Sequence, residues 1–162
     1  MIWLWISVFS LIFLFGFVVI FGAPYVPTLK SQQKIAIELL KLKPGQVFYD
    51  LGCGDGRLLK AAAQQGIDVV GYEINPLLAV ISWLRTRRCK GHVKVVCGNF
   101  WRANISDADG VFVFLVERHM KRLDKFLNRQ LKQHKVQVAS YGFQIPGHKL
   151  VARRGAMFLY EY

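Results

Sequence analysis

The hydrophobic pattern divides the chain near residue 29. Residues 2–23 form an apolar run in which Ser7 and Ser10 are the only polar side chains, and short apolar and amphipathic segments alternate beyond residue 30. At about 1.5 Å per helical residue, the first run matches the roughly 30 Å hydrocarbon core of a bilayer. The pattern therefore predicts one transmembrane helix over residues 2–23.

A cleaved signal peptide is the alternative interpretation of this apolar run. Signal peptides begin with cationic residues, have apolar cores of about 7–15 residues and end at a small-residue cleavage site. Residues 1–29 contain no charged side chain, and Pro24 follows Ala23, which makes cleavage there unfavourable. We therefore expect an uncleaved membrane anchor.

The basic residues around the anchor predict its orientation. The N-terminal flank has no lysine or arginine, whereas Lys30, Lys34, Lys41 and Lys43 follow the apolar run closely. Because basic residues accumulate on the cytoplasmic side of membrane helices, we expect the rest of the chain in the cytoplasm or its organellar equivalent.

Residues 24–30 are predicted to be a connector that begins with the motif PYVPT. Its two prolines favour extended backbone. An amphipathic helix is expected from Ser31 to Lys41, with Thr28 or Ser31 as the cap of its first turn.

The domain predicted over residues 31–162 alternates apolar runs typical of strands with amphipathic helices. This alternation indicates an α/β domain with a doubly wound, mostly parallel sheet. The expected helix before the last hairpin is missing or reduced to residues 143–149, which shortens the C-terminal part. The predicted strands cover 47–52, 67–73, 92–98, 110–116 and 136–142, the helices 57–65, 76–87 and 117–132, and the hairpin 150–162.

Composition narrows the class of protein. The chain has 162 residues, a net charge of +12 and 53% apolar residues, which fits one folded domain and excludes disorder. The basic excess fits a domain held against an anionic membrane. Cys53, Cys89 and Cys97 form no disulfide framework, and His92 with the last two lacks paired metal-ligand spacing, so we expect no metal.

Candidate chemistry begins where the first predicted strand ends. Asp50 is followed by a turn with glycines at 52, 54 and 56, which lets the backbone approach a ligand closely. The next helix favours an anion at its start. A dinucleotide fingerprint would need glycine at position 57, which is Arg57, and no phosphate-binding loop of nucleotide triphosphatases is present. The turn suits a ligand that carries a carboxylate.

The next two strand ends add complementary groups. Glu73 lies 21 residues after Gly52 and can accept hydrogen bonds from both hydroxyls of a ribose. Asn99 can pair with an adenine edge, and Phe100 can lie against the ring. A plain loop and a solvent-exposed carboxylate remain the alternatives for the first two positions.

The segments DLGCGDGRLL, GYEINP and VVCGNFW resemble the first three motifs of class I S-adenosylmethionine-dependent methyltransferases, which have a Rossmann-like fold. The resemblance covers about residues 31–145. It implies that S-adenosyl-L-methionine is the cofactor, with its methionine part, ribose and adenine held at successive strand ends. The implied cofactor-binding residues are Asp50, Gly52, Cys53, Gly54, Glu73, Asn99 and Phe100.

A narrower resemblance joins the anchor, PYVPT, this domain and SYGFQIP near residue 145. This combination is similar to the membrane-anchored protein-lysine methyltransferases that modify the c subunit of ATP synthase and the adenine nucleotide translocase. In that group the segment before the domain completes the cofactor pocket, which makes Tyr25 and Thr28 candidates here.

The substrate side is less defined. The fourth strand lacks the Asn/Asp-Pro-Pro-Tyr/Phe signature of amide and base methylation and continues Leu115-Val116-Glu117 instead, so no catalytic residue is assigned. An apolar entry would favour the uncharged form of a lysine nucleophile. The candidates for lining the substrate channel are Tyr25, Trp101, Glu117, Tyr141 and Phe143. Each of these side chains has an ordinary alternative role in the core, at the membrane interface or at a helix start.

These observations lead to three hypotheses. The first is a membrane-tethered methyltransferase that acts on a lysine of a small integral membrane protein, with the lipid bilayer as its other partner. The second is a methyltransferase of RNA or of a lipid or quinone, although nucleic acid is not the expected partner. The third is a non-catalytic cofactor-binding module, against which the intact Asp50, Gly52, Gly54 and Glu73 argue.

Overall fold

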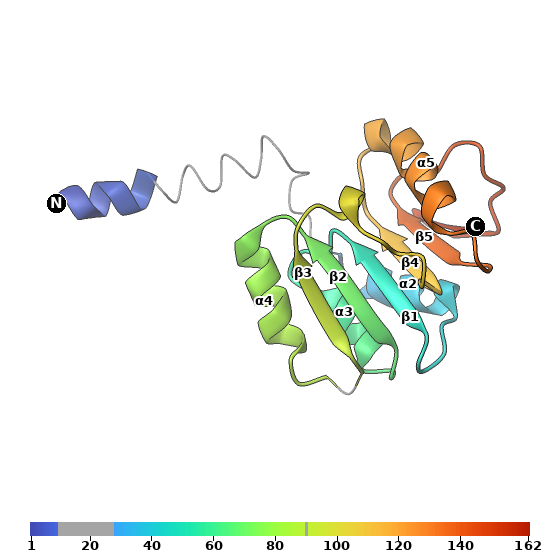
Figure 1. Ribbon diagram of the computed structural model, residues 1–162, viewed down its shortest axis with the longest axis horizontal. Helices are drawn as coiled ribbons and strands as arrows, with labels where there is room; N and C mark the ends of the chain where they lie inside the picture. The colour runs from blue at the N-terminus through green and yellow to red at the C-terminus, as the bar shows by residue number, and fades with distance from the viewer. Residues whose placement is uncertain (10–27, 90) are drawn as a thin grey trace.

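The computed structural model describes residues 1–9, 28–89 and 91–162 (Figure 1). Residues 2–9 are helical, whereas the rest of the predicted anchor and most of the connector, Tyr25 included, lie outside the described residues. Within the described ranges, no helix is long and apolar enough to cross a membrane.

A seven-stranded mixed sheet organises the domain, in the order β3-β2-β1-β4-β5-β7-β6. The first five strands in this order are parallel, and β7 runs antiparallel to both β5 and β6. The predicted doubly wound, mostly parallel sheet and its final hairpin are confirmed. The strands are β1 (Val47–Leu51), β2 (Asp68–Glu73), β3 (Val93–Cys97), β4 (Gly110–Val113), β5 (Gln137–Tyr141), β6 (Ala152–Arg154) and β7 (Met157–Glu161).

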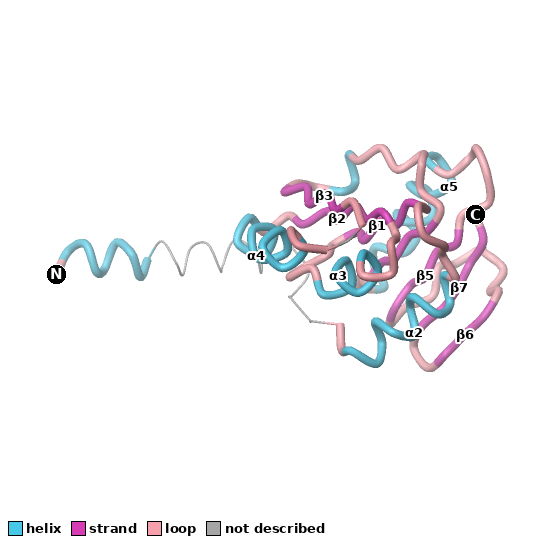
Figure 2. The backbone as a smooth tube through the Cα atoms, turned by 90° about the horizontal axis from the view of Figure 1, so that it is seen from below, coloured by secondary structure: helices cyan, strands magenta, loops and turns pink. Residues whose placement is uncertain are grey.

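Helices cover both faces of the sheet (Figure 2). One face carries α2 (Lys30–Leu40), α3 (Arg57–Ala63) and α4 (Pro76–Thr86), and the other carries α5 (Met120–Gln130). Two short 3-10 helices, η1 (Phe100–Arg102) and η2 (Glu117–His119), follow β3 and β4. The helix predicted over 117–132 therefore begins with a 3-10 turn, and the reduction of residues 143–149 to a loop is confirmed.

Side chains that alternate along the strands fill two separate cores. Phe48 points to the side of α2 and α3, whereas its neighbour Tyr49 points to the side of α5. On the α5 side, Leu123 and Leu127 are completely buried against the sheet. Burial on both faces explains why the central strands read as nearly continuous apolar runs.

The start of α2 differs from the prediction. Leu29 occupies the N-cap position without a side-chain cap, so neither Thr28 nor Ser31 caps this helix. The hydroxyl of Ser31 donates to the Gln32 side chain instead. The buried Gln33 reaches back from the first turn, and its Nε2 donates to the Thr28 carbonyl at 2.7 Å. A glutamine side chain thus fixes the chain entering the helix.

The fourth strand is shorter than predicted. Pairing with β5 stops at Val113 opposite Ser140, and Phe114 to Val116 lie outside the sheet. The chain leaves the sheet there to begin η2 at Glu117. Apolar composition alone does not mark this departure, because Leu115 is still buried outside the strand.

Candidate functional site

The turn after β1 is held against the neighbouring strand. The backbone amides of Gly52 and Cys53 both donate to the Tyr72 carbonyl at 2.9 Å. Gly52 has φ +106° and Gly54 φ +55°, conformations that L side chains rarely adopt. Apart from its two chain neighbours, no described residue places an atom within 4 Å of where a Cβ of Gly52 would be, so the described part of the chain leaves this backbone open to a ligand.

Glu73 ties two loops together at the end of β2. Its Oε2 accepts from the Gly54 amide at 2.9 Å, and its Oε1 accepts from the Asn75 amide at 2.8 Å. The side chain is only 8% exposed. A carboxylate has about four acceptor positions, so both oxygens keep capacity for further donors. Glu73 is therefore both a structural brace and a free acceptor.

Asp50 is the second carboxylate at this edge. It is 3% exposed, and no described residue donates a hydrogen bond to its carboxylate. Burial, and secondarily the charge of Glu73, raise the pKa of Asp50 from 3.8 to about 8. A buried carboxylate without a partner is costly when it is ionised. The site therefore favours a cation beside Asp50.

Asp55 is a residue that the sequence did not single out. Its Oδ2 accepts from Arg57 Nε at 2.8 Å and from Arg85 Nη1 at 2.6 Å. These pairs join the start of α3 to the last turn of α4 and leave Asp55 buried. The sequence signal for this residue was an aspartate in the glycine-rich turn with two arginines, Arg57 and Arg85, within 30 residues of it.

The end of β3 lies beside Glu73, because the Gly98 amide donates to the Glu73 carbonyl at 2.8 Å. The Oδ1 of the exposed Asn99 accepts from the Trp101 amide at 3.1 Å and so caps η1. No described residue uses the Asn99 amide nitrogen. The adenine role of Asn99 stays a prediction that rests on this nitrogen.

The two aromatic residues that follow Asn99 pack together. The Phe100 and Trp101 ring centroids are 4.4 Å apart, and both rings meet Phe126 of α5. Arg122 lies 4.3 Å over the Trp101 ring. These contacts account for Phe100 and Trp101 as packing residues, and their predicted roles toward cofactor and substrate remain untested.

Aromatic rings also meet at the ends of β4 and β5. Tyr141 and Phe114 make an edge-to-face pair with centroids 4.8 Å apart, and both are half-buried. Phe143 is half-buried, and its carbonyl accepts from the buried Ser140 hydroxyl at 2.7 Å. Glu117 is exposed at the start of η2. Phe114 was not among the predicted site residues, because the sequence places it inside the predicted strand 110–116, whereas in the structure it follows the end of β4.

Cys53 is buried within the turn, with its Sγ 3.7 Å from Ser82 Oγ of α4. Burial, followed by the charge of Asp50, raises the pKa of the Cys53 thiol. The thiol is therefore protonated and serves as packing between the turn and α4. In the part of the chain that the structure describes, no three His, Cys, Asp or Glu side chains are placed to hold a metal.

Taken together, Asp50, Gly52, Gly54 and Glu73 converge on one turn, with Asn99 at the neighbouring strand end. Thr28 is half-buried at the entry to α2, and its only described hydrogen bond is through its carbonyl.

The sheet order and the braced glycine turn define a domain of the class I, Rossmann-like methyltransferase fold. Residues 50–152 match the ANTKMT methyltransferase domain family, and the chain belongs to that family. The match begins at Asp50, the carboxylate at the end of β1.

Several relatives of the chain are protein-lysine methyltransferases. It is 34% identical over 125 residues to the Xenopus laevis lysine N-methyltransferase of the ATP synthase c protein, covering 76% of this chain and 54% of that relative. It is 34% identical to a protein-lysine N-methyltransferase of Saccharolobus islandicus, covering 76% of this chain and 79% of that relative. The adenine nucleotide translocase lysine N-methyltransferase of Mus musculus is 33% identical, and the match covers 80% of this chain and 57% of that relative. The chain thus spans about half the length of several curated relatives.

Solved structures share the fold. An RNA methyltransferase from Salinibacter ruber, in complex with S-adenosyl-L-homocysteine, superposes with a TM-score of 0.76 at 28% identity, over 85% of this chain and 92% of that one. A methyltransferase from Geobacter sulfurreducens in complex with the same molecule has a TM-score of 0.61 at 20% identity, over 83% and 57%.

Proposed function

We propose that this protein is an S-adenosyl-L-methionine-dependent methyltransferase that methylates a lysine side chain of a membrane protein. The observation that carries the proposal is the pair of buried carboxylates at adjacent strand ends. Among the described residues, Asp50 has no hydrogen-bond donor and Glu73 is bound by two backbone amides. Membership of the family and the names of its lysine-modifying relatives support it.

The residues at the turn fit the amino-acid part of this cofactor. Asp50 would hold its ammonium group, which supplies the cation that the buried carboxylate lacks. The open backbone at Gly52 would receive the carboxylate end. Gly54 contributes indirectly, because its amide is already bound to Glu73 and so keeps the turn in shape.

The next two strand ends fit the nucleoside. The spare acceptor positions of Glu73 would take the two ribose hydroxyls. The unused amide nitrogen of Asn99 would donate to a ring nitrogen of adenine. The family resemblance implies Thr28 and Tyr25 as further residues of this pocket, and Tyr25 lies outside the described residues.

When it is bound, the cofactor supplies an electrophilic methyl group on a sulfonium. The protein has to orient an uncharged lysine amine in line with that group and to exclude water. Tyr141 and Phe114 form an apolar wall at the ends of β4 and β5. Such a wall disfavours the ammonium form of lysine, whose ordinary pKa is about 10.4.

The membrane tether is part of the proposal. The uncharged residues 2–23 are long and apolar enough in sequence to anchor the chain, with the domain on the cytoplasmic side or its organellar equivalent. A tether confines enzyme and substrate to one surface and raises their effective concentration. It favours a small integral membrane protein as the substrate.

RNA is the second candidate substrate. The Salinibacter ruber protein is an RNA methyltransferase, and its structure covers most of both chains. The net charge of +12 would attract a polyanion. The narrower similarity to lysine methyltransferases favours the protein substrate.

Methyl-labelled cofactor tests the choice directly. The full-length protein in detergent is incubated with the label and a membrane extract, and protein, lipid and RNA are then separated. We expect label on a small membrane protein, which disappears when lysines are acetylated beforehand and when Glu73→Gln replaces the wild type. Label in RNA or lipid would overturn the substrate class, and no label in any fraction would overturn the enzymatic activity.

A further inference from the structure

Helix α4 exposes large apolar residues on its outward face, which is unusual for a helix on the surface of a domain. The side chains that it buries are small, namely Ala79, Ser82 and Thr86, each at most 5% exposed. Surface helices of globular domains ordinarily bury the large apolar residues and expose the polar ones. The outward residues are Leu77 (47% exposed), Val80 (53%), Trp83 (53%) and Leu84 (47%).

The inward face explains why its own residues are small. The Thr86 hydroxyl donates to the Ser82 carbonyl at 2.8 Å, and Ser82 Oγ lies 3.7 Å from Cys53 Sγ. A Cβ on Gly56 would come within 2.9 Å of the Ser82 Cα, so the helix packs closely on the turn. Close packing restricts only the inward face. It gives no reason for large apolar residues on the outward face.

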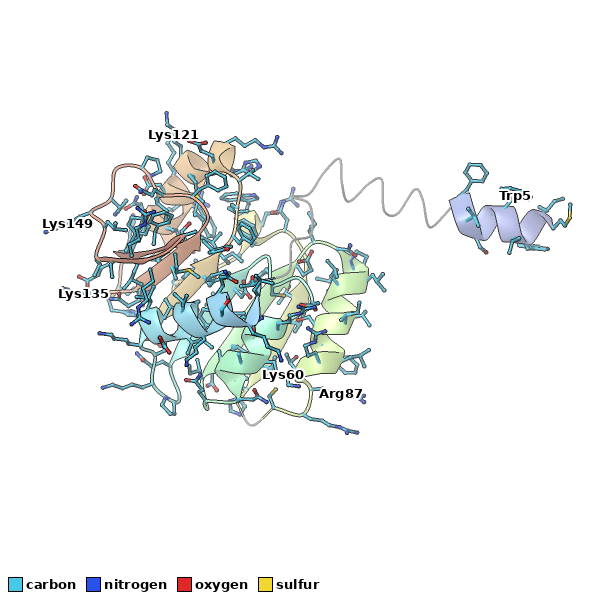
Figure 3. All side chains as sticks on the ribbon, turned by 180° about the vertical axis from the view of Figure 1, so that it is seen from behind. Trp5, Lys60, Arg87, Lys121, Lys135 and Lys149 are labelled. Atoms are coloured by element: carbon cyan, nitrogen blue, oxygen red, sulfur yellow. The ribbon has the colours of Figure 1, made fainter. Side chains whose placement is uncertain are left out.

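The charged residues of helix α4 and of the segment that follows it have one sign. Arg87 and Arg88 are exposed just beyond the C-terminal end of α4. Arg87, labelled in Figure 3, lies 5.9 Å over the Trp83 ring. No acidic residue occurs between Ile74 and Gly91. An apolar surface with a tryptophan and arginines at its border is typical of segments that lie in a membrane interface.

We propose that the outward face of α4 docks onto the surface of an anionic lipid bilayer. This inference rests on the proposed membrane tether. Six residues, 24–29, separate the apolar run 2–23 from α2. Even fully extended, they span only about 20 Å, which keeps the domain within reach of the bilayer. Anionic headgroups would complement the arginines, and the acyl boundary would take the apolar side chains.

Docking in this way orients the candidate site. Ile74 is 50% exposed and follows Glu73 directly, so the apolar face begins at the edge of the cofactor site. With α4 on the membrane, the strand ends of β1 to β3 lie close to the headgroups. The site would then receive lysines near the membrane surface in preference to those far from it.

An environment-sensitive fluorophore on α4 tests the contact. Cys89 and Cys97 are replaced by serine in the full chain, and the label is attached through Val80→Cys. A matched control carries it through Lys125→Cys, an exposed position on α5 across the sheet. The protein is reconstituted into phosphatidylcholine vesicles with or without phosphatidylglycerol, and brominated acyl chains serve as quencher.

We expect a blue shift and quenching at position 80 in anionic vesicles, and neither at position 125. Arg87→Gln and Arg88→Gln should each lower the ratio of docked to undocked protein about fivefold. Flotation with the vesicles reports the tether separately, and no step depends on catalysis. Flotation without quenching at position 80 overturns the docking inference alone, and failure to float overturns both. A blue shift in detergent that grows with protein concentration would assign the face to a second copy of the chain instead.

Discussion

The carboxyl ends of β1 and β5 each hold a buried polar side chain, and the two side chains differ in their hydrogen bonding. Ser140, completely buried on β5, donates its hydroxyl to the Phe143 carbonyl at 2.7 Å. Asp50, 3% exposed on β1, receives no hydrogen bond from the described residues. A satisfied polar group belongs to the fold. A carboxylate in the same setting that accepts no hydrogen bond from the described residues is a candidate place for a ligand.

The contrast extends to the loops of the two halves of the site. Beside β1 and β2, the carboxylates of Glu73 and Asp55 hold the loops in place. Beside β4 and β5, the aromatic rings of Phe114 and Tyr141 pack against each other. We therefore expect the first half to be rigid and specific for one cofactor, and the second to accept a bulky, apolar approach.

The largest expected difference between the two halves of the site is in the stability lost when one glycine in each half is replaced by alanine. Gly56 has φ +77°, and a Cβ there would lie 2.3 Å from Ser82 Oγ and 2.9 Å from its Cα. Gly56→Ala should lower the free energy of unfolding by about 3 kcal/mol. At Gly142, with φ +88°, the nearest atom is on the Phe114 ring at 3.3 Å. Gly142→Ala should cost about 1 kcal/mol. Equal losses in urea unfolding would contradict the difference in rigidity.

Loss of the Glu73 carboxylate should be next in effect. Glu73→Gln keeps the size of the side chain but removes one acceptor and the charge. The affinity for S-adenosyl-L-methionine should fall about a hundredfold, measured by calorimetry, because hydrogen bonds to charged groups are worth about 1.5–3 kcal/mol each. Glu117→Gln, at an exposed position in the other half, is the control and should bind as the wild type does.

Asp50→Asn should lower cofactor affinity about tenfold through loss of the ammonium partner. It should also change the pH dependence of stability. In the ligand-free fold the pKa of Asp50 is about 8, above its ordinary 3.8. Between these values the folded state keeps a proton that the unfolded state has released, so the free energy of unfolding decreases as pH rises from about 4 to about 8.

Thermal unfolding across that range measures this slope, which Asp50→Asn should reduce. Cofactor affinity should move the opposite way and increase as pH approaches about 8, because ionised Asp50 binds the ammonium. Affinity that is independent of pH in the wild type would show that Asp50 is not the partner of that group.

The smallest effect is expected at Tyr141. Tyr141→Phe keeps the edge-to-face pair with Phe114 and should change kcat by about threefold or less, whereas Tyr141→Ala opens the wall. The alanine variant should raise KM for the protein substrate and leave cofactor binding unchanged. A large loss of kcat in Tyr141→Phe would mean that the hydroxyl takes part in proton transfer.

The order and type of most elements could be predicted from the sequence, because the central strands β1 and β4 are buried almost throughout and some helices begin at a strong local signal. Pro76 after Asn75 is such a signal, and the Asn75 side chain does cap α4. The errors came where contacts override local preference. Helix α2 has no side-chain cap, and Gln33 instead donates to the Thr28 carbonyl before the helix. Strand β4 ended early although the next residues are apolar.

The candidate site was predictable only in part. The positions of Asp50, Gly52, Gly54 and Glu73 follow from glycine spacing and strand ends, which are local features of the chain. Phe114, Asp55 and the packing of Trp101 on α5 depend on segments that are distant in sequence. The outward face of α4 is of the same kind, because the exposure of its apolar residues depends on how the helix packs on the rest of the domain.

The sequence by itself determined the class of fold, the glycine turn and the acidic residues at its strand ends, because hydrophobic period and backbone freedom are local properties. Only the tertiary structure decided which polar groups are satisfied. Glu73 is bound by two amides and Asp50 by no described donor. That difference arises from burial and from the approach of separate loops, which no local pattern encodes.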